Sequence, residues 1–276
     1  MNRFWNRFIK PIIETVRPVQ MLEIGADRGW NTQYLLAYCR ETGAHLTIID
    51  PAPDPELRGR LNGYEREYTH FPVKSIDGIS AITPPDLALI DGDHNWFTVF
   101  SELTLLFARA ASTSNALPIV LFHDIAWPYG RRDMYYNPDN IEPENRHPFA
   151  YRGMIPDSPD LVDHGMNGSY ANALHEGGPQ NGVLTAIEDF ISSISTGVKF
   201  YTLPFFNGLG ILVPEQRMTP DLQALIDGFF SADSLLQSCK DLERDSLYLR
   251  IELVRTQMQL KRRTEALKRA RTLLGQ

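Results

Sequence analysis

The chain has 276 residues, of which 43% are hydrophobic and 22% charged, and its formal net charge is −7, as in an ordinary globular protein. No run of about 18 apolar residues occurs, so we expect no membrane span, and Met1–Lys10 lacks the apolar core of a signal peptide. Cys39 and Cys239 stand far apart, outside any metal-type spacing, so we expect no disulfide and a cytoplasmic location.

The charge is divided unevenly along the chain. Residues 237–276 contain ten Lys and Arg against five Asp and Glu, whereas the other residues contain 17 against 29. An acidic body argues against nucleic acid as a partner. The basic stretch is most simply the solvated face of a helix.

Apolar runs alternate with helical patterns in the first half of the chain. After an N-terminal segment, residues 1–17, with a predicted helix from Trp5 to Val16, we expect strands at 19–24, 46–50, 66–71, 87–91 and 119–123, and helices at 32–42, 75–82 and 96–111. This alternation predicts an α/β fold with a Rossmann-like, doubly wound, mostly parallel sheet. Ligands bind at the carboxyl ends of such strands. The residues at these ends are Gly25, Asp50, Asp91, His123 and Asp124.

The pattern breaks at residues 125–181, which are rich in Pro, Gly, Asn, Asp and aromatic side chains. A loop of this length inside a compact domain is usually functional or disordered. Six aromatic residues between Trp127 and Tyr151 argue against disorder. We therefore interpret 125–181 as a lid or acceptor-binding insertion in a domain that spans residues 18–215.

Two further strands close the predicted sheet. After a predicted helix at 182–195, strand-like runs at 198–203 and 209–213 flank Asn207-Gly208, a pair typical of hairpin turns. The sheet should then have seven strands, of which the last is antiparallel.

A C-terminal extension, residues 216–276, is predicted to contain one long helix from about Asp233. Its positions at alternating steps of three and four residues suggest a coiled coil and a homodimer, with weak positions at Ser246, Thr256 and Arg263. The alternative is an amphipathic helix packed on the domain. The positions are Cys239, Leu242, Ser246, Leu249, Leu253, Thr256, Leu260, Arg263, Leu267, Ala270 and Leu274.

The first strand-to-helix turn is glycine-rich, from Glu23 to Thr32. Gly25 and Gly29 permit a tight turn and a close approach of the backbone to a ligand. Asp50 ends the second strand, where an acid accepts hydrogen bonds from ribose hydroxyls. Together they predict a nucleoside-binding site.

This turn, Glu-Ile-Gly-Ala-Asp-Arg-Gly-Trp-Asn-Thr, resembles motif I of class I S-adenosylmethionine-dependent methyltransferases, and most closely that of the metal-dependent catechol-type O-methyltransferases. The run Leu89-Ile-Asp-Gly-Asp-His-Asn-Trp-Phe97 is similar to the signature of the macrocin O-methyltransferase and cephalosporin-tailoring group. The resemblance covers about residues 15–215 and implies S-adenosylmethionine as cofactor. The implied cofactor contacts are Glu23, Gly25, Ala26, Gly29, Asn31, Thr32, Asp50, Ser75 and Asp91.

The resemblance also implies a divalent cation, Mg²⁺ or Mn²⁺, held by Asp91, His123 and Asp124. His123 departs from the family pattern, because imidazole is a poor ligand for Mg²⁺. Three alternatives stay open: the two acids hold the ion with water, the ion is softer and Mn²⁺-like, or no metal binds and the acids cap turns.

A base must remove the proton from the acceptor hydroxyl. His94 stands where the catechol-type enzymes have a lysine, and Asp93 where the macrocin group has an aspartate. His123 is a third candidate if it does not bind metal.

The insertion supplies the candidate acceptor contacts Trp127, Tyr129, Arg131, Arg132 and His175. Paired arginines beside aromatic rings suit an acceptor with sugar rings and an anionic group, although a self-packed loop is the alternative. The run from His175 to Gly182 resembles segments of bacterial methyltransferases associated with polysaccharide assembly.

We therefore expect an O-methyltransferase for a bacterial polysaccharide, a glycolipid or a glycosylated metabolite. A non-catalytic cofactor-binding scaffold of a polysaccharide assembly complex is the alternative. The predicted hairpin and the spacing of Gly25 and Gly29 argue against a third candidate, a nicotinamide dehydrogenase.

Overall fold

The computed structural model describes residues 1–113 and 115–273. Its internal contacts divide the chain into two units, Met1–Leu225 and Ile226–Gln276, which are described separately. The predicted boundaries of the methyltransferase-like domain, at residues 18 and 215, stay predictions.

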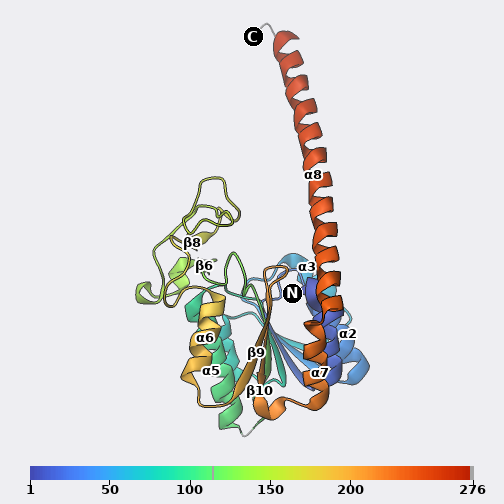
Figure 1. Cartoon of the computed structure of the whole chain (residues 1–276), viewed down its shortest axis with the longest axis vertical. Coiled ribbons are helices and arrows are strands. Elements are labelled where there is room, and N and C mark those ends of the chain that lie inside the picture. Colours follow the sequence, from blue (N-terminus) through green and yellow to red (C-terminus); the bar gives the residue numbers. More distant parts are fainter. Residues whose placement is uncertain (114, 274–276) are drawn as a thin grey trace. The chain divides into compact units, whose positions relative to one another are not determined.

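The first unit is built around a seven-stranded sheet (Figure 1). Its antiparallel member is the last strand in the chain, which runs opposite to both its neighbours, while the first five strands pair in parallel. The predicted fold class is therefore confirmed. In spatial order the strands are β3 (Tyr68–Phe71), β2 (His45–Ile49), β1 (Gln20–Ile24), β4 (Leu87–Ile90), β5 (Ile119–His123), β10 (Leu209–Pro214) and β9 (Val198–Leu203).

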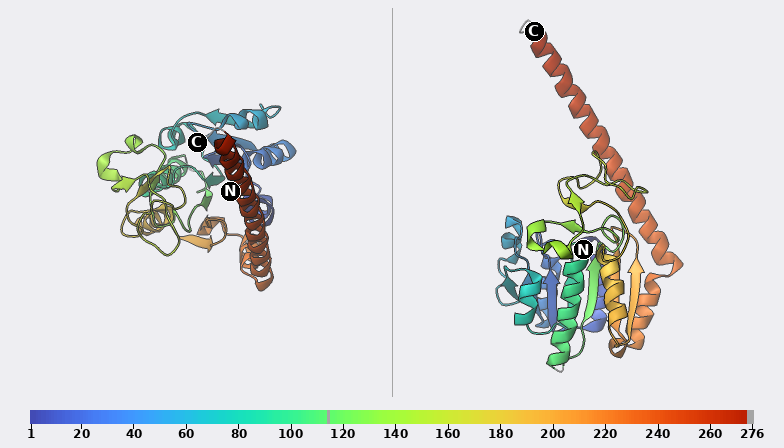
Figure 2. Two further views of the ribbon diagram at one scale, coloured as in Figure 1. Left: turned by 90° about the horizontal axis from the view of Figure 1, so that it is seen from above. Right: turned by 90° about the vertical axis from the view of Figure 1, so that its left-hand side faces the viewer.

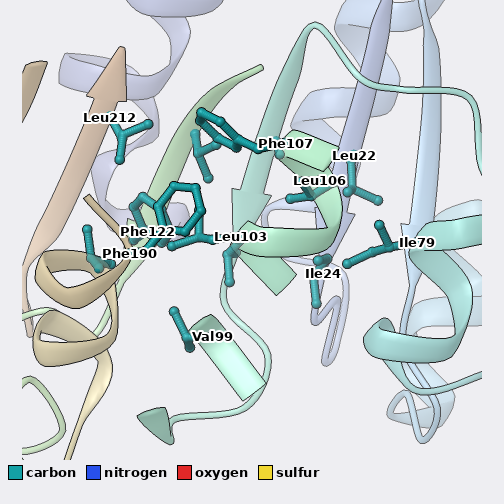
Figure 3. Close-up of a cluster of buried hydrophobic side chains, with 14 of the residues drawn as sticks. Leu22, Ile24, Ile79, Val99, Leu103, Leu106, Phe107, Phe122, Phe190 and Leu212 are labelled. Carbon is teal, nitrogen blue, oxygen red and sulfur yellow. The ribbon is translucent and has the colours of Figure 1, made fainter. Parts of the chain in front are cut away.

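Helices cover both faces of this sheet (Figures 1 and 2). Helices α5 (Trp96–Ser112) and α6 (Val183–Ser193) lie together on one face, and α2 (Thr32–Thr42) lies on the other. Alternate strand residues point toward α5 and α6, because side chains along a strand alternate between its two faces. Figure 3 shows the resulting buried cluster, which includes Leu22, Ile24, Phe122 and Leu212 from the strands and Leu103, Leu106 and Phe190 from the helices.

Several elements differ from the prediction in detail. The predicted N-terminal helix is a 3₁₀ turn η1 (Asn2–Phe4), a π-helical turn η2 (Trp5–Ile9) and helix α1 (Lys10–Val16). The predicted helix at 75–82 is α4 (Ser75–Gly78) followed by the 3₁₀ turn η3 (Ile79–Ala81).

Helix α3 (Pro55–Leu61) was missed, although the sequence carries its signals. The Asp54 carboxylate accepts a hydrogen bond from the Glu56 backbone N–H, and Pro55 is the first helical residue. Both are preferred at helix starts.

The insertion is folded and carries its own small sheet, which has strands β6 (Met134–Tyr135), β8 (Ala171–Ala173) and β7 (Phe149–Ala150) in that order. Two 3₁₀ turns, η4 (Pro138–Asn140) and η5 (Pro143–Asn145), lie between β6 and β7. Tyr129, Met134, Met154 and Leu161 form one buried apolar cluster, and Tyr135, Ile141 and Ala171 form a second. The segment lies above the carboxyl ends of the parallel strands (Figure 2).

The turn between β9 and β10 has three consecutive residues with positive φ: Phe206 (52°), Asn207 (70°) and Gly208 (95°). Asn and Gly accept this conformation readily, whereas a bulky residue such as Phe does so only under constraint. The predicted hairpin is confirmed, and the conformation of Phe206 marks a place where the surrounding structure constrains the backbone.

After the 3₁₀ turn η6 (Glu215–Arg217) and helix α7 (Pro220–Phe229), the chain continues as α8 (Ala232–Leu273), so the predicted long helix is confirmed. Several leucines of its repeat are exposed, among them Leu249 (72%), Leu260 (65%) and Leu267 (65%), while Leu274 lies outside the described residues. Within residues 1–113 and 115–273, no helix combines the length and apolarity that crossing a membrane requires. Cys39 and Cys239 are both free thiols.

Candidate active site

The glycine turn after β1 is shaped first by the protein itself. Gly25 has a φ of 82°, and a Cβ added there would stand 2.3 Å from the Asp91 carbonyl oxygen at the end of β4. A Cβ on Gly29 would stand 2.6 Å from the Leu57 side chain. The structure shows that these glycines let the ends of β1, β4 and α3 approach one another. That they make room for a ligand stays a prediction.

Asp50 holds this turn from the end of β2. Its Oδ2 atom accepts hydrogen bonds from the backbone N–H groups of Ala26 (2.8 Å) and Asp27 (3.0 Å), and Oδ1 accepts one from Ala52 (2.9 Å). The carboxylate therefore fixes the position of the glycine turn relative to the end of β2.

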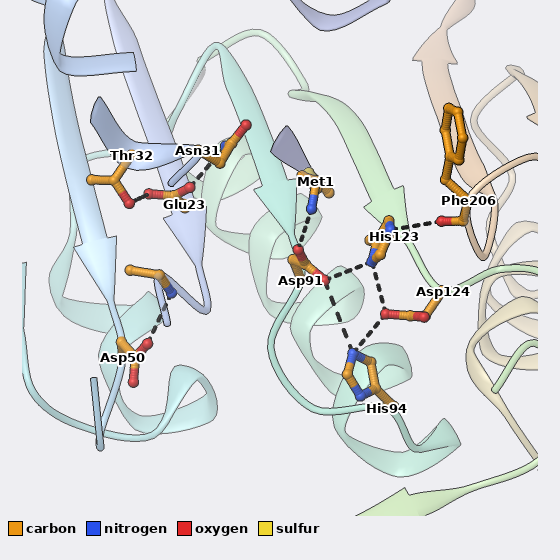
Figure 4. Close-up of polar contacts among 11 residues, drawn as sticks. Met1, Glu23, Asn31, Thr32, Asp50, Asp91, His94, His123, Asp124 and Phe206 are labelled. Atoms are coloured by element: carbon orange, nitrogen blue, oxygen red, sulfur yellow. Dashed lines mark hydrogen bonds and ion pairs between the residues drawn. The ribbon is translucent and has the colours of Figure 1, made fainter. Parts of the chain in front are cut away.

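The remaining polar residues of the motif bind one another (Figure 4). Buried Glu23 accepts hydrogen bonds from the Asn31 amide (2.8 Å) and the Thr32 hydroxyl (2.6 Å). Burial raises the pKa of Glu23 to about 7, although these two bonds oppose the shift. In this structure, Asn31 and Thr32 fix the start of α2 to β1.

A cavity of about 580 Å³ opens beside the turn. Four of the predicted cofactor residues line it, namely Gly25, Asp50, Ser75 and Asp91. The other five are not among its lining residues: Glu23, Ala26, Gly29, Asn31 and Thr32. The sequence did not predict its other side, which the insertion supplies with Tyr135, Tyr136, Asn137, Asn140 and Ile141. A larger hollow of about 920 Å³ over α3 and β3 contains none of the predicted residues.

Glu102 on α5 is another polar residue that the sequence did not single out, and it neighbours Ser75 in the cavity lining. It is fully buried, and neither carboxyl oxygen has a hydrogen-bond partner of normal geometry among the described residues. Burial raises its pKa to about 8, and neighbouring Ser75 offsets only part of the shift. The sequence carried a signal for this residue: Glu102 is the one acid in the predicted helix 96–111, and it stands among the apolar residues that face the core.

Because the pKa of Glu102 is higher in the folded chain than its ordinary value of 4.5, its contribution to stability is complete below about pH 4.5 and is lost as pH rises through about 8. We expect Glu102→Gln to unfold about 2–4 °C above the wild type at pH 8.5, and to lose that advantage at pH 5. Thermal unfolding at both pH values measures this, with exposed Glu41→Gln as control. If the unfolding temperatures of all three proteins changed with pH in the same way, the raised pKa of Glu102 would be contradicted.

Four polar side chains from the ends of β4 and β5 form an acid–histidine cluster: Asp91, His94, His123 and Asp124 (Figure 4). His123 Nδ1 lies 3.0 Å from Asp91 Oδ1 and 2.8 Å from Asp124 Oδ2. His94 Nε2 lies 2.9 Å from Asp124 Oδ2 and 4.0 Å from Asp91 Oδ1. The Met1 amine pairs with the other oxygen of Asp91 at 2.8 Å.

The electrostatics of the cluster follow from burial and from these pairs. Burial opposes ionisation of Asp91, but the Met1 ammonium and His123 hold its pKa well below the usual range. Burial likewise opposes ionisation of Asp124, but the two histidines hold its pKa low. The carboxylates in turn raise the pKa of His94 to about 10 and that of His123 to about 9, against the effect of burial.

The three candidate bases therefore occupy different places. His94 and His123 belong to the cluster, and the His94 ring stacks on Tyr129 with their centroids 5.3 Å apart. Asp93 lines the cavity instead, where its carboxylate accepts a hydrogen bond from the Thr98 hydroxyl (3.3 Å), and burial raises its pKa.

Two of the predicted acceptor contacts bind other parts of the protein. Arg132 is fully buried and donates to the carbonyls of Ala173 and Pro159. Arg131 pairs with both oxygens of Glu188 on α6. Internal carbonyls occupy the Arg132 guanidinium, as the alternative of a self-packed loop predicts for this residue; its contact with an acceptor stays a prediction.

Of the other predicted acceptor contacts, two are packed inside the protein and one is exposed. Tyr129 is buried against His94, and Trp127 packs against the first apolar cluster of the insertion. The His175 side chain is 77% exposed and pairs with Asp160.

Asp133 was not predicted but anchors the insertion over the sheet. One of its carboxylate oxygens accepts hydrogen bonds from the backbone N–H groups of Trp96 and Gly182, both at 2.7 Å, at the starts of α5 and α6. The other accepts a bond from the Tyr135 hydroxyl (2.8 Å). The insertion is thus tied to the starts of α5 and α6.

Comparison with known proteins finds similarity to methyltransferases. Residues 22–125 match the sequence model of a methyltransferase domain. No curated protein matches the chain. The chain also resembles a methyltransferase from Podospora anserina solved with S-adenosylhomocysteine (14% identity, TM-score 0.47, 75% of this chain and 76% of that chain covered). It resembles a putative caffeoyl-CoA O-methyltransferase from Staphylococcus aureus as well (14%, 0.43, 75% and 80%).

The sheet order, with its antiparallel last strand, is that of class I methyltransferases. The matched segment runs from within β1 to just after β5 and contains the glycine turn and the acid–histidine cluster. Residues 22–125 are therefore similar to a methyltransferase domain, and the sheet that contains them has the strand order of this class. Class I methyltransferases take the methyl group from S-adenosylmethionine.

Proposed function

We propose that the protein is an S-adenosylmethionine-dependent O-methyltransferase that methylates a hydroxyl of a sugar-containing acceptor with the help of a divalent cation. One observation carries the proposal: Asp91 belongs both to the cavity beside the glycine turn and to the acid–histidine cluster. A methyl donor in the cavity and an acceptor hydroxyl at the cluster would therefore meet at this residue.

The cavity fits the donor in its chemistry. Gly25 exposes backbone at one end, Asp50 offers a carboxylate for ribose hydroxyls, and Ser75 lies near the proposed adenine end. Glu23, Asn31 and Thr32 would act by holding the turn.

The cluster supports deprotonation of the acceptor. A divalent cation bound by Asp91, Asp124 and His123 would lower the pKa of a hydroxyl beside it. Such a cation would also neutralise the carboxylate charges that raise the pKa of His94, so we choose His94, beside Asp124, as the base that accepts the proton.

The acceptor would lie on aromatic rings that the sequence did not single out. Tyr136 is 56% exposed and Tyr170 is 39% exposed, and their rings meet edge to face with centroids 5.6 Å apart. The Tyr136 ring lies 5.8 Å from that of His94. Exposed aromatic faces beside a deprotonation site suit the apolar face of a sugar ring, in a polysaccharide, a glycolipid or a glycosylated metabolite.

Calorimetry with S-adenosylhomocysteine tests the proposal directly. We expect micromolar-order binding to cofactor-free protein. The affinity of Asp50→Ala should be at least about 100-fold weaker, because the carboxylate would no longer accept two charge-assisted hydrogen bonds from the ribose hydroxyls. Asp86→Ala is the matched control, because the Asp86 carboxylate also binds two backbone N–H groups, those of Val19 and Gln20. Absence of binding to the wild type would overturn the proposed function.

We also propose that α8 joins two copies of the chain as a coiled coil. The support is the repeat of exposed leucines along a helix of 42 residues. Light scattering over a dilution series should show a dimer that Leu253→Glu dissociates, whereas Glu265→Leu, outside the repeat, does not. A monomer at all concentrations would remove this proposal.

A further inference from the structure

His123 is held in one tautomeric form by a contact outside the cluster. Its Nε2 atom lies 3.0 Å from the Phe206 carbonyl oxygen (Figure 4). A carbonyl oxygen can only accept a hydrogen bond, so Nε2 must carry the hydrogen. In the neutral ring, Nδ1 then presents its lone pair to the cluster.

The Phe206 carbonyl is fixed in place by its surroundings. The residue has the constrained φ of 52° noted above, in the turn between β9 and β10. Its ring meets Phe4 edge to face with centroids 5.5 Å apart, and the Arg3 guanidinium lies 3.8 Å from its centroid. Backbone strain persists where neighbouring contacts impose it, and it is concentrated at functional sites.

Three acceptor atoms consequently converge: His123 Nδ1, Asp91 Oδ1 and Asp124 Oδ2. They lie within 4.8 Å of one another, and the two pairs that involve Nδ1 are separated by 3.0 and 2.8 Å. Facing lone pairs repel, so a positive species must lie among them, either a proton on Nδ1 or a metal ion. A ligating histidine that donates its other N–H to a backbone carbonyl is the usual arrangement in metal sites.

We infer that this cluster binds a first-row transition metal through His123 Nδ1, in preference to Mg²⁺. The inference rests on the proposed function and specifies its cation. Mg²⁺ selects oxygen ligands, whereas imidazole suits softer ions, so one nitrogen with two carboxylates favours ions such as Co²⁺ or Fe²⁺. His123 thus distinguishes this chain from an all-oxygen site.

Metal titration of the full, untagged chain tests the inference. We expect Co²⁺ to bind at least about tenfold more tightly than Mg²⁺, and His123→Asn, which replaces the nitrogen ligand with an oxygen, to narrow that ratio at least about tenfold. With Mn²⁺ bound, pulsed electron paramagnetic resonance should detect coupling to a ¹⁴N nucleus in the wild type and not in His123→Asn.

Two further variants identify the nitrogen. The coupling should persist in His94→Gln, and also in His175→Asn, which removes a surface histidine paired with Asp160. Absence of ¹⁴N coupling in the wild type, its loss only in His94→Gln, equal affinities for Co²⁺ and Mg²⁺, or no metal binding at millimolar concentration would each overturn the inference.

Binding of S-adenosylhomocysteine separates this inference from the proposed function. His123→Asn should bind it as the wild type does, which also shows that the variant is folded. If the wild type binds S-adenosylhomocysteine but shows no nitrogen ligand, only the choice of metal fails; if it does not bind, the proposed function fails.

Discussion

Replacing Asp91 with Asn is expected to slow methyl transfer by at least about a hundredfold, and by up to about a thousandfold. The change keeps the size of the side chain in the cavity wall but removes the negative charge that faces His123 and the proposed cation. We propose that the glycine turn and Asp50 supply the main contacts to the methyl donor, so binding of S-adenosylhomocysteine should change no more than about threefold.

Transfer of a labelled methyl group to a sugar acceptor, found by screening with the wild type, measures this effect. Asp160→Asn is the control, since Asp160 pairs with a histidine on the surface of the insertion. An Asp91→Asn variant that retains more than a tenth of the wild-type rate would mean that the meeting of cavity and cluster at Asp91 has no catalytic role.

The sheet could be predicted from the sequence because each strand is a short, continuous apolar run bounded by turn residues. Parallel order then brought the carboxyl ends together, so Asp91, His123 and Asp124 were correctly expected to be neighbours. Their contacts with Phe206 and Met1 could not be predicted, because they join residues 83 and 90 positions apart in the sequence.

The insertion shows where sequence reasoning fails. Its strands have only two or three residues, too few for an alternating pattern to appear. Two adjacent arginines suggested an anion site, but a guanidinium can equally satisfy buried carbonyls, and Arg132 does so with Ala173 and Pro159. Only the folded arrangement shows that Tyr136 faces the cluster while Arg132 faces the interior.

Replacing Gly25 with Ala is expected to destabilise the methyltransferase domain by more than about 3 kcal/mol. One part of this cost is the left-handed φ of 82°, which any Cβ makes unfavourable by about 1–2 kcal/mol. The other part is steric: the new Cβ would lie 2.3 Å from the Asp91 carbonyl oxygen and 2.7 Å from the Gly92 Cα, and both are backbone atoms that cannot rotate away.

Gly43 separates these two contributions. It has nearly the same φ, 77°, but a Cβ there would meet no atom within 4 Å, so Gly43→Ala should cost only the conformational part. Urea unfolding of the two variants and the wild type measures the difference, and calorimetry should show weaker S-adenosylhomocysteine binding for Gly25→Ala alone. Equal destabilisation by both substitutions would contradict a close approach of β1 to β4; a clear excess for Gly25→Ala would mean that the glycine turn is required by the neighbouring strand before any cofactor binds.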